Sequence, residues 1–386
     1  MKNLIINVSL KRNIGRILFY SFLVFAINHY TNIANAKGSD KNKVQTWKFQ
    51  YSLTTVYDNN ILKYSDKYLD RFVNNLDPGR FRINSTGDIS ILNSLYISRT
   101  MYLFGKVKSI PSIELRYKNY SDNSVKNFWG FGVGWRQYLT KSTSFKIRYY
   151  NIPSFYVRNY RDEDLTKVIG YTPASFRPFE FSKSDLSLWF RNYFYKRTQT
   201  TFYISYFWYK HSPDYTEYDS KNFLVGFKLR QRLTKQLNAH MGYNYVLSNA
   251  NGFDEPGETK ELSNDVDASF GQHIFYLGME LKMPNIFFER NSLRITGYFS
   301  KRFYSTTRSA IIDPLHSGRV DNVVNLEGIY KIYLTKYLEV AGFVVWNLRD
   351  SNTKLPFNGI TVSNEKNYSQ NIFGLRFRLN ITMNKN

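Results

Sequence analysis

The chain of 386 residues contains no cysteine. It therefore has no disulfide framework, no thiolate nucleophile and no N-terminal cysteine that carries lipid. Glycine and proline are modest, at 21 and 10 residues, which excludes a collagen-like or low-complexity chain. Beyond the N-terminal region, no apolar run approaches the roughly 20 residues that a membrane-spanning helix requires. A helical membrane protein is therefore excluded.

Acidic residues and histidines are also scarce. The chain has 30 acidic and 53 basic side chains, and no glycine-rich phosphate loop or acid and histidine cluster with metal-ligand spacing is evident. No serine lies two residues from any histidine of the mature chain, which argues against a Ser-His pair on one strand face. His211 and Asp214, near a loop, leave a rim protease open as an alternative. We expect no enzyme, no metal and no cofactor.

The first 36 residues have the features of a secretory signal peptide. Basic residues begin it, an apolar run covers 17–27, and Ala34-Asn35-Ala36 forms an A-x-A cleavage site. The apolar run is too short to anchor the chain as a spanning helix. We expect export, followed by a single mature domain, 37–386. An exported chain whose cations alternate with apolar residues is not expected to bind nucleic acid, despite its basic excess.

Aromatic residues are abundant, with 32 tyrosines and 31 phenylalanines. Many lie in segments where apolar and polar residues alternate. The clearest is 223–248, where two alternating arms flank the short segment 233–236. On the first arm, the apolar residues are Phe223, Val225, Phe227 and Leu229. A period of two is the period of a strand, so this segment is predicted to be a β-hairpin with one apolar and one polar face.

The same pattern predicts 14 strands, near 46–57, 88–101, 108–120, 126–137, 143–158, 180–194, 199–211, 220–232, 237–248, 268–282, 291–304, 319–333, 337–349 and 367–381. Short turns, as at 138–141 and 334–337, alternate with long connections, and a short amphipathic helix is predicted within 61–72. This layout, with arms of roughly 12 residues, is typical of a membrane β-barrel. A soluble β-sandwich is the alternative, but its strands are usually about 5–6 residues with even loops.

In this layout the chain resembles the Gram-negative outer-membrane β-barrel proteins, porin-like in the broad sense, over 46–383. Its last strand, 371–379, is similar to the C-terminal signal read by the barrel assembly machinery, with Gly374, Phe377 and Leu379 at matching positions. The usual terminal phenylalanine is missing. The resemblance implies an all-β, transmembrane, antiparallel up-and-down barrel with short periplasmic turns and long extracellular loops. It also implies contact with outer-membrane lipids and lipopolysaccharide, and insertion by that machinery.

Charged residues of the expected strands are the candidate site. By our count, the acidic residues within the expected strands are Glu114, Asp185, Glu280, Glu327 and Glu339. Basic residues of these strands repeatedly alternate with apolar ones. A cation facing lipid at the bilayer midplane costs about 2–4 kcal/mol, so these cations are expected to face the lumen. The predicted pore-lining residues are Arg116, Lys146, Arg148, Lys228, Arg230, Arg376, Arg378, Glu114 and Glu280.

A cationic lumen favours anions over cations. The prediction is therefore a passive channel for small polar or anionic solutes. Alternatively, the cations pair with acidic neighbours, as Glu114 could with Arg116, and simply fill the barrel. The chain would then be a non-conducting surface protein for adhesion or envelope integrity. An outer-membrane enzyme is the third and least favoured reading.

Overall fold

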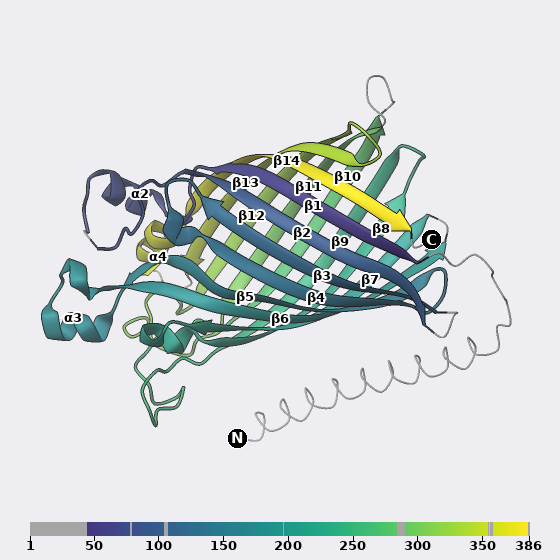
Figure 1. Ribbon diagram of the computed structural model, residues 1–386. Coiled ribbons are helices and arrows are strands. Elements are labelled where there is room, and N and C mark those ends of the chain that lie inside the picture. The colour runs from purple at the N-terminus through teal and green to yellow at the C-terminus, as the bar shows by residue number, and fades with distance from the viewer. Residues whose placement is uncertain are drawn as a thin grey trace, which may run out of the picture.

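The computed structural model describes residues 45–77, 79–103, 107–195, 197–283, 290–353, 355 and 358–384. The predicted signal peptide and turn 104–106 lie outside these residues. Each strand pairs antiparallel with its neighbours in sequence, and the first pairs with the last, which closes a barrel of 14 strands. The strands are strongly tilted, and the three labelled helices lie at one end of the barrel, away from the C-terminus (Figure 1).

The strands and helices have the following bounds. The strands are β1 (Thr46–Asp58), β2 (Asp88–Leu103), β3 (Val107–Tyr120), β4 (Phe128–Tyr138), β5 (Thr143–Arg161), β6 (Phe176–Tyr195), β7 (Thr198–His211), β8 (Ser220–Arg232), β9 (Leu237–Ala250), β10 (Phe270–Met283), β11 (Arg290–Tyr304), β12 (Arg319–Tyr333), β13 (Leu338–Thr353) and β14 (Tyr368–Asn384). The helices are α2 (Asp66–Val73), α3 (Glu163–Ile169) and α4 (Gly359–Lys366), with 3-10 turns η1 (Ser124–Lys126), η2 (Pro173–Ser175) and η3 (Pro213–Tyr218).

All 14 predicted strands are present, and β8 and β12 have the predicted bounds. The main difference lies at the loop end, where β5, β6 and β13 continue further than predicted. The extensions of β1 and β13 add Asp58 and Asp350 to the strands. The count of acidic strand residues was also wrong within the predicted ranges, because it omitted Asp88, Glu180 and Asp321. Helix α2 was predicted, whereas α3 and α4 were not. No helix of the described ranges is long and apolar enough to cross a membrane.

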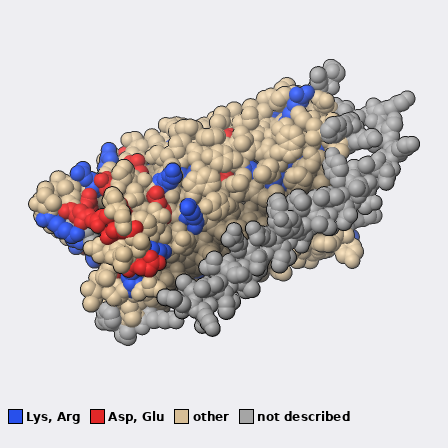
Figure 2. Space-filling view, turned by 90° about the horizontal axis from the view of Figure 1, so that it is seen from below, with Lys and Arg blue, Asp and Glu red and all other residues tan. Residues whose placement is uncertain are grey.

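The strands turn their apolar residues outward. On β14 the exposed fractions are 52% for Phe373, 43% for Leu375 and 41% for Phe377. The polar residues between them lie on the opposite face, toward the interior. The visible wall of the barrel is accordingly almost free of charge between its two ends (Figure 2). An apolar exterior on a closed sheet satisfies the two demands of a bilayer, because no backbone edge and no polar belt meets hydrocarbon.

The connection between β1 and β2 forms a small core of its own at the loop end. Its buried residues pack with two tyrosines at the ends of β3 and β5: Ile61, Leu62, Tyr64, Tyr68, Ile83, Tyr120 and Tyr156. The Asn60 side chain donates hydrogen bonds to the backbone oxygens of Tyr64 (2.8 Å) and Ser369 (3.2 Å). The connection is therefore fixed to the inner side of β14.

Candidate functional site

The inner wall carries the charged residues that the sequence predicted to face the lumen. On β3, Glu114 and Arg116 alternate with Ile113 and Leu115, whose exposed fractions of 54% and 48% place them on the outer face. The same alternation holds for the predicted residues on β5, β8, β10 and β14. The chain is a closed β-barrel with an apolar outer face and a charged inner wall, which is the architecture of barrels that span a membrane.

The first charged cluster joins β3 to β5 across β4. Glu114 accepts a hydrogen bond from Arg116 Nε (2.6 Å) and another from Arg148 Nη2 (2.8 Å). Arg148 can reach across β4 because the inward positions there are Gly132 and Gly134, which pair with Glu114 and Arg148 respectively. The predicted pairing of Glu114 with Arg116 is thus present, and a second arginine shares the same carboxylate.

Two further glutamates are shared in the same way. Glu280 on β10 lies 3.0 Å from Arg230 on β8 and 3.2 Å from Arg294 on β11. Three strands further along the barrel, Glu339 on β13 accepts from Arg376 (3.0 Å) and Arg378 (3.1 Å) on β14. The three clusters contain six arginines and three glutamates, which is a net charge of +3.

Among the described residues, neither of the two predicted lysines forms an ion pair with a cluster glutamate. The Lys146 ammonium lies 5.3 Å from the ring centre of Trp189, and Lys228 lies 5.9 Å from that of Tyr276. Such contacts attract a cation without neutralising its charge. Lys146 also lines an interior cavity of about 170 Å³ with Arg136 and Arg191. The positive charge of these two lysines is therefore not neutralised by a directly bonded carboxylate.

Sequence reasoning missed part of this wall. Arg294 alternates with Leu293 and Ile295, which was the available signal, yet it was not selected. Glu339 was recognised as a strand residue but was not expected to join Arg376 and Arg378. His211, which together with Asp214 left a rim protease open as an alternative, lies 3.3 Å from Asp219 through its Nδ1.

Large inward-facing rings lie flat against the wall where a neighbouring strand has glycine. A Cβ atom added to Gly374 would lie 2.1 Å from the Phe343 ring, and one added to Gly226 would lie 2.3 Å from the Tyr203 ring. Tyr276 covers Gly242 in the same way. Glycine has no side chain to push these rings away from the wall. The rings therefore occupy the wall rather than the centre of the barrel.

The connection between β1 and β2 reaches into the barrel from the loop end. Lys63, which follows β1 closely, lines an interior cavity of about 480 Å³ with residues of β10 to β14, among them Tyr298, Arg302, Arg349 and Tyr368. Arg158 on β5 donates a hydrogen bond to the backbone oxygen of Leu62. The connection thus narrows the loop end of the barrel.

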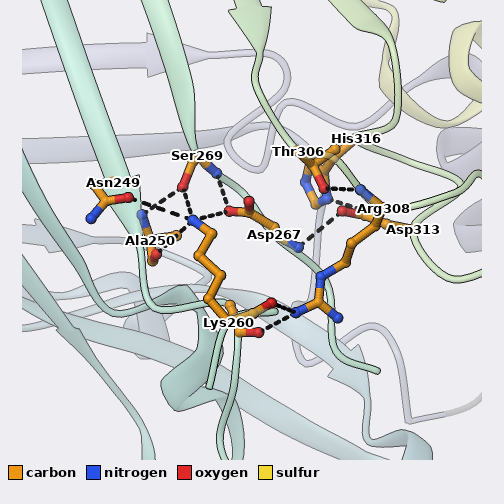
Figure 3. A network of polar contacts seen from close by, with 10 residues as sticks. Asn249, Ala250, Lys260, Asp267, Ser269, Thr306, Arg308, Asp313 and His316 are labelled. Carbon is orange, nitrogen blue, oxygen red and sulfur yellow. Dashed lines mark hydrogen bonds and ion pairs between the residues drawn. The ribbon is translucent and has the colours of Figure 1, made fainter. Parts of the chain in front are cut away.

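A second polar network holds the connections between β9 and β10 and between β11 and β12 (Figure 3). Lys260 Nζ lies 2.9 Å from Asp267 and donates to Ser269 Oγ at 2.8 Å. Arg308 donates to the backbone oxygens of Gly252 (2.5 Å) and Ser263 (2.5 Å). The contacts of Lys260 and Arg308 therefore hold the 251–267 segment in a fixed conformation.

No protein-family model and no curated protein matches the sequence. Among solved structures, a bacterial polysaccharide outer membrane secretin is similar over 86% of this chain and 98% of its own, with 9% identity and a TM-score of 0.45. An anion-selective porin from Comamonas acidovorans is similar over 87% of this chain and 99% of its own, with 8% identity and a TM-score of 0.41. The outer membrane channel DcaP of Acinetobacter baumannii is similar over 89% of this chain and 100% of its own, with 13% identity and a TM-score of 0.44. At this level of similarity, neither the solute nor the role of any residue can be assigned to this chain from these structures.

Proposed function

We propose that the protein is an outer-membrane channel through which small polar and anionic solutes diffuse passively. The observation that carries this proposal is the sharing of each cluster glutamate between two arginines. Equal pairing would have given a neutral wall, whereas Glu114, Glu280 and Glu339 leave one positive charge in each cluster. Rings of cationic side chains lower the barrier for anions and raise it for cations.

The proposal includes the route and the surroundings of the protein. A signal peptide over 1–36 would direct export, the assembly machinery would insert the barrel, and lipids and lipopolysaccharide would surround it. The short turns would face the periplasm and the long loops the outside. All nine predicted residues, from Glu114 to Arg378, would line the solute path; no enzymatic activity is proposed.

One observation favours the second candidate, a non-conducting surface protein. The connection between β1 and β2 carries its own hydrophobic core and is hydrogen-bonded through Asn60 to β14, so it stands across the loop end as a fixed element. In a channel it acts as a constriction, and in a surface anchor it acts as a plug.

Single-channel recording in planar bilayers separates the two candidates. We expect discrete conductance steps from the purified, folded protein, with a reversal potential of the anion-selective sign in a salt gradient. Deleting 65–82, which removes α2, should raise the conductance if the connection is a constriction. A folded and inserted protein that conducts neither as wild type nor after this deletion would support the surface anchor.

A further inference from the structure

Three cations of the inner wall are neighbours near the turn end, which is the end of the barrel that carries the short turns. Arg136 on β4 is directly opposite Lys146 on β5 in the strand register, and Arg191 on β6 is opposite Ser144 of β5. Like charges directly opposite each other on paired strands destabilise a sheet. The pair of Arg136 and Lys146 therefore destabilises the wall unless an anion offsets its charge.

Nothing in the described part of the chain neutralises these three cations. None of them forms an ion pair there, and neither guanidinium donates a hydrogen bond. The ammonium of Lys146 lies 5.3 Å from the ring centre of Trp189, which attracts the cation without neutralising it. Glu114 and Glu280, on β3 and β10, are each already bonded to two arginines. The three cations thus keep a local charge of +3.

The cations line a cavity of about 170 Å³, which Ser144 and Trp189 complete, and no described carboxylate is among its lining residues. A cavity of about 150 Å³ accommodates a molecule the size of benzene, so this one has room for a tetrahedral oxyanion. Guanidinium and ammonium groups only donate hydrogen bonds, and the serine hydroxyl can donate as well. A ligand with several acceptor oxygens and more than one negative charge therefore suits this lining.

A second cavity of the same kind, of about 160 Å³, begins two residues further along β6, at Tyr193. The amide of Asn238, which is 6% exposed, also lines it, and its Nδ2 donor has no hydrogen-bond partner among the described residues. A buried donor without an acceptor is destabilising, and an oxyanion would satisfy it. The cations of this cavity are Arg197, Arg230, Arg232 and Lys282, of which Arg230 is bonded to Glu280.

We propose that the cavity of Arg136, Lys146 and Arg191 binds a phosphate group, as free phosphate or as part of a small phosphorylated solute. The inference rests on the proposed channel function and names the class of anion that the wall retains. A phosphate monoester carries a charge of about −1.5 to −2 at neutral pH, so it offsets more of the local charge than chloride does. Two guanidinium groups can each bind phosphate oxygens in bidentate geometry. Binding also removes the repulsion between the opposed cations.

The direct test is binding of inorganic phosphate to the complete mature protein, refolded into non-ionic detergent micelles free of lipopolysaccharide, because lipopolysaccharide carries phosphate groups of its own. Isothermal titration at constant ionic strength should show saturable binding to wild type. Arg136→Gln and Arg191→Gln should each weaken it at least about tenfold, because each removes hydrogen bonds between charged groups. The matched control is Lys331→Gln, which removes a lysine of β12 that lines neither cavity and should bind as wild type does.

Thermal unfolding separates a built site from a general effect of charge. Without phosphate and at low salt, Lys146→Gln should unfold at a temperature equal to or above that of wild type, because it removes one of two opposed cations. Saturating phosphate should then raise the unfolding temperature of wild type more than that of Lys146→Gln, because only wild type keeps the full set of donors. Heat-modifiable gel migration shows that each variant is folded.

Single-channel recording distinguishes the site from the function on which it rests. In a conducting barrel, phosphate should reduce the chloride current saturably, and less so in Arg191→Gln. Phosphate binding by a barrel that conducts nothing would refute the channel and support the site. Absence of saturable phosphate binding by wild type, or equal binding by wild type and both arginine variants, would overturn the site even if the barrel conducts. Binding of glycerol 3-phosphate as well as inorganic phosphate would extend the site to phosphorylated solutes, and binding of inorganic phosphate alone would assign it to the free ion.

Discussion

Charge reversal in the three arginine-glutamate clusters is the most direct test of the inner wall. The triple variant Arg148→Glu, Arg230→Glu and Arg376→Glu changes each cluster by two units, from +1 to −1. The total therefore changes from +3 to −3. Folding places each new carboxylate beside an existing glutamate, so gel migration must first confirm a closed barrel.

The expected size of the effect follows from Coulomb's law. A unit charge at about 8 Å in water acts on a monovalent ion with about 0.5 kcal/mol before screening. At physiological salt, where the Debye length is about 8 Å, about 0.2 kcal/mol remains. Anion and cation then differ by about 0.4 kcal/mol, or roughly twofold in permeability for each cluster. At about 10 mM salt the Debye length is about 30 Å, and the ratio should rise to roughly fourfold.

The assay is the reversal potential in a tenfold gradient of potassium chloride. Perfect selectivity gives about 59 mV, and a ratio of two gives roughly 15 mV. Wild type should show the anion-selective sign and the triple variant the opposite sign. Two matched series extend the comparison, with cluster totals of 0 and +6 beside +3 in wild type and −3 in the triple variant. Glutamine at the same three positions should abolish the effect of the clusters, and Glu114, Glu280 and Glu339 changed together to glutamine should strengthen anion selectivity. Conducting variants with one common reversal potential would refute the reasoning.

Three further predictions concern the loops and the glycine-backed rings. Burial and the neighbouring Asp265 raise the pKa of Asp254 in the 251–267 segment from its ordinary value of 3.8 to about 6. The folded protein therefore binds this proton more tightly, so its stability should fall as the pH rises from about 4 to about 6, measured as the unfolding temperature. Gly374→Ala places a Cβ 2.1 Å from the Phe343 ring; it should push that ring toward the lumen and lower single-channel conductance, and adding Phe343→Ala should restore it. An epitope tag at Gly257, which has open space around its Cα, should bind antibody on intact cells.

Each of these has a matched control. Asp254→Asn should flatten the fall in stability between pH 4 and 6, and an equal slope in both proteins would assign it to other groups. Gly342→Ala meets no atom within 4 Å and should leave conductance unchanged. A tag at Lys235, in a short turn, should be reached only after the outer membrane is opened. Ser351, near the loop end of β13, is fully buried and is therefore unsuitable for a tag.

The sequence by itself determined the strands and their two faces. In a membrane barrel the side chains that face lipid must be apolar, whereas those that face the interior can be of any type. Because successive side chains of a strand face opposite sides, this requirement is visible in the sequence at every second residue. For this reason β8 and β12 were predicted with their correct bounds. Arg376 and Arg378 were assigned to the inner wall from their apolar neighbours alone. Pairing within one strand, as between Glu114 and Arg116, was also visible because the two residues are two positions apart.

Only the tertiary structure decided which distant residues meet. Arg148 reaches Glu114 because the registers of β3, β4 and β5 align them over glycine positions, and register is not recorded in alternation. Arg230 and Arg294 share Glu280 for the same reason, although they come from three different strands. The net positive charge of the wall could therefore not be obtained by counting residues along the chain.

The loop end depended on tertiary structure most of all. Asp254, Glu258 and Asp265 have no metal-ligand spacing in sequence, and Glu217 belongs to another connection. The fold of the 251–267 segment around Lys260 and Arg308 brings the first three together. A backbone hydrogen bond from Gly252 to Glu217 joins η3 to this segment. Loops follow no periodic rule, so their contacts arise from packing and hydrogen bonding between segments far apart in the chain.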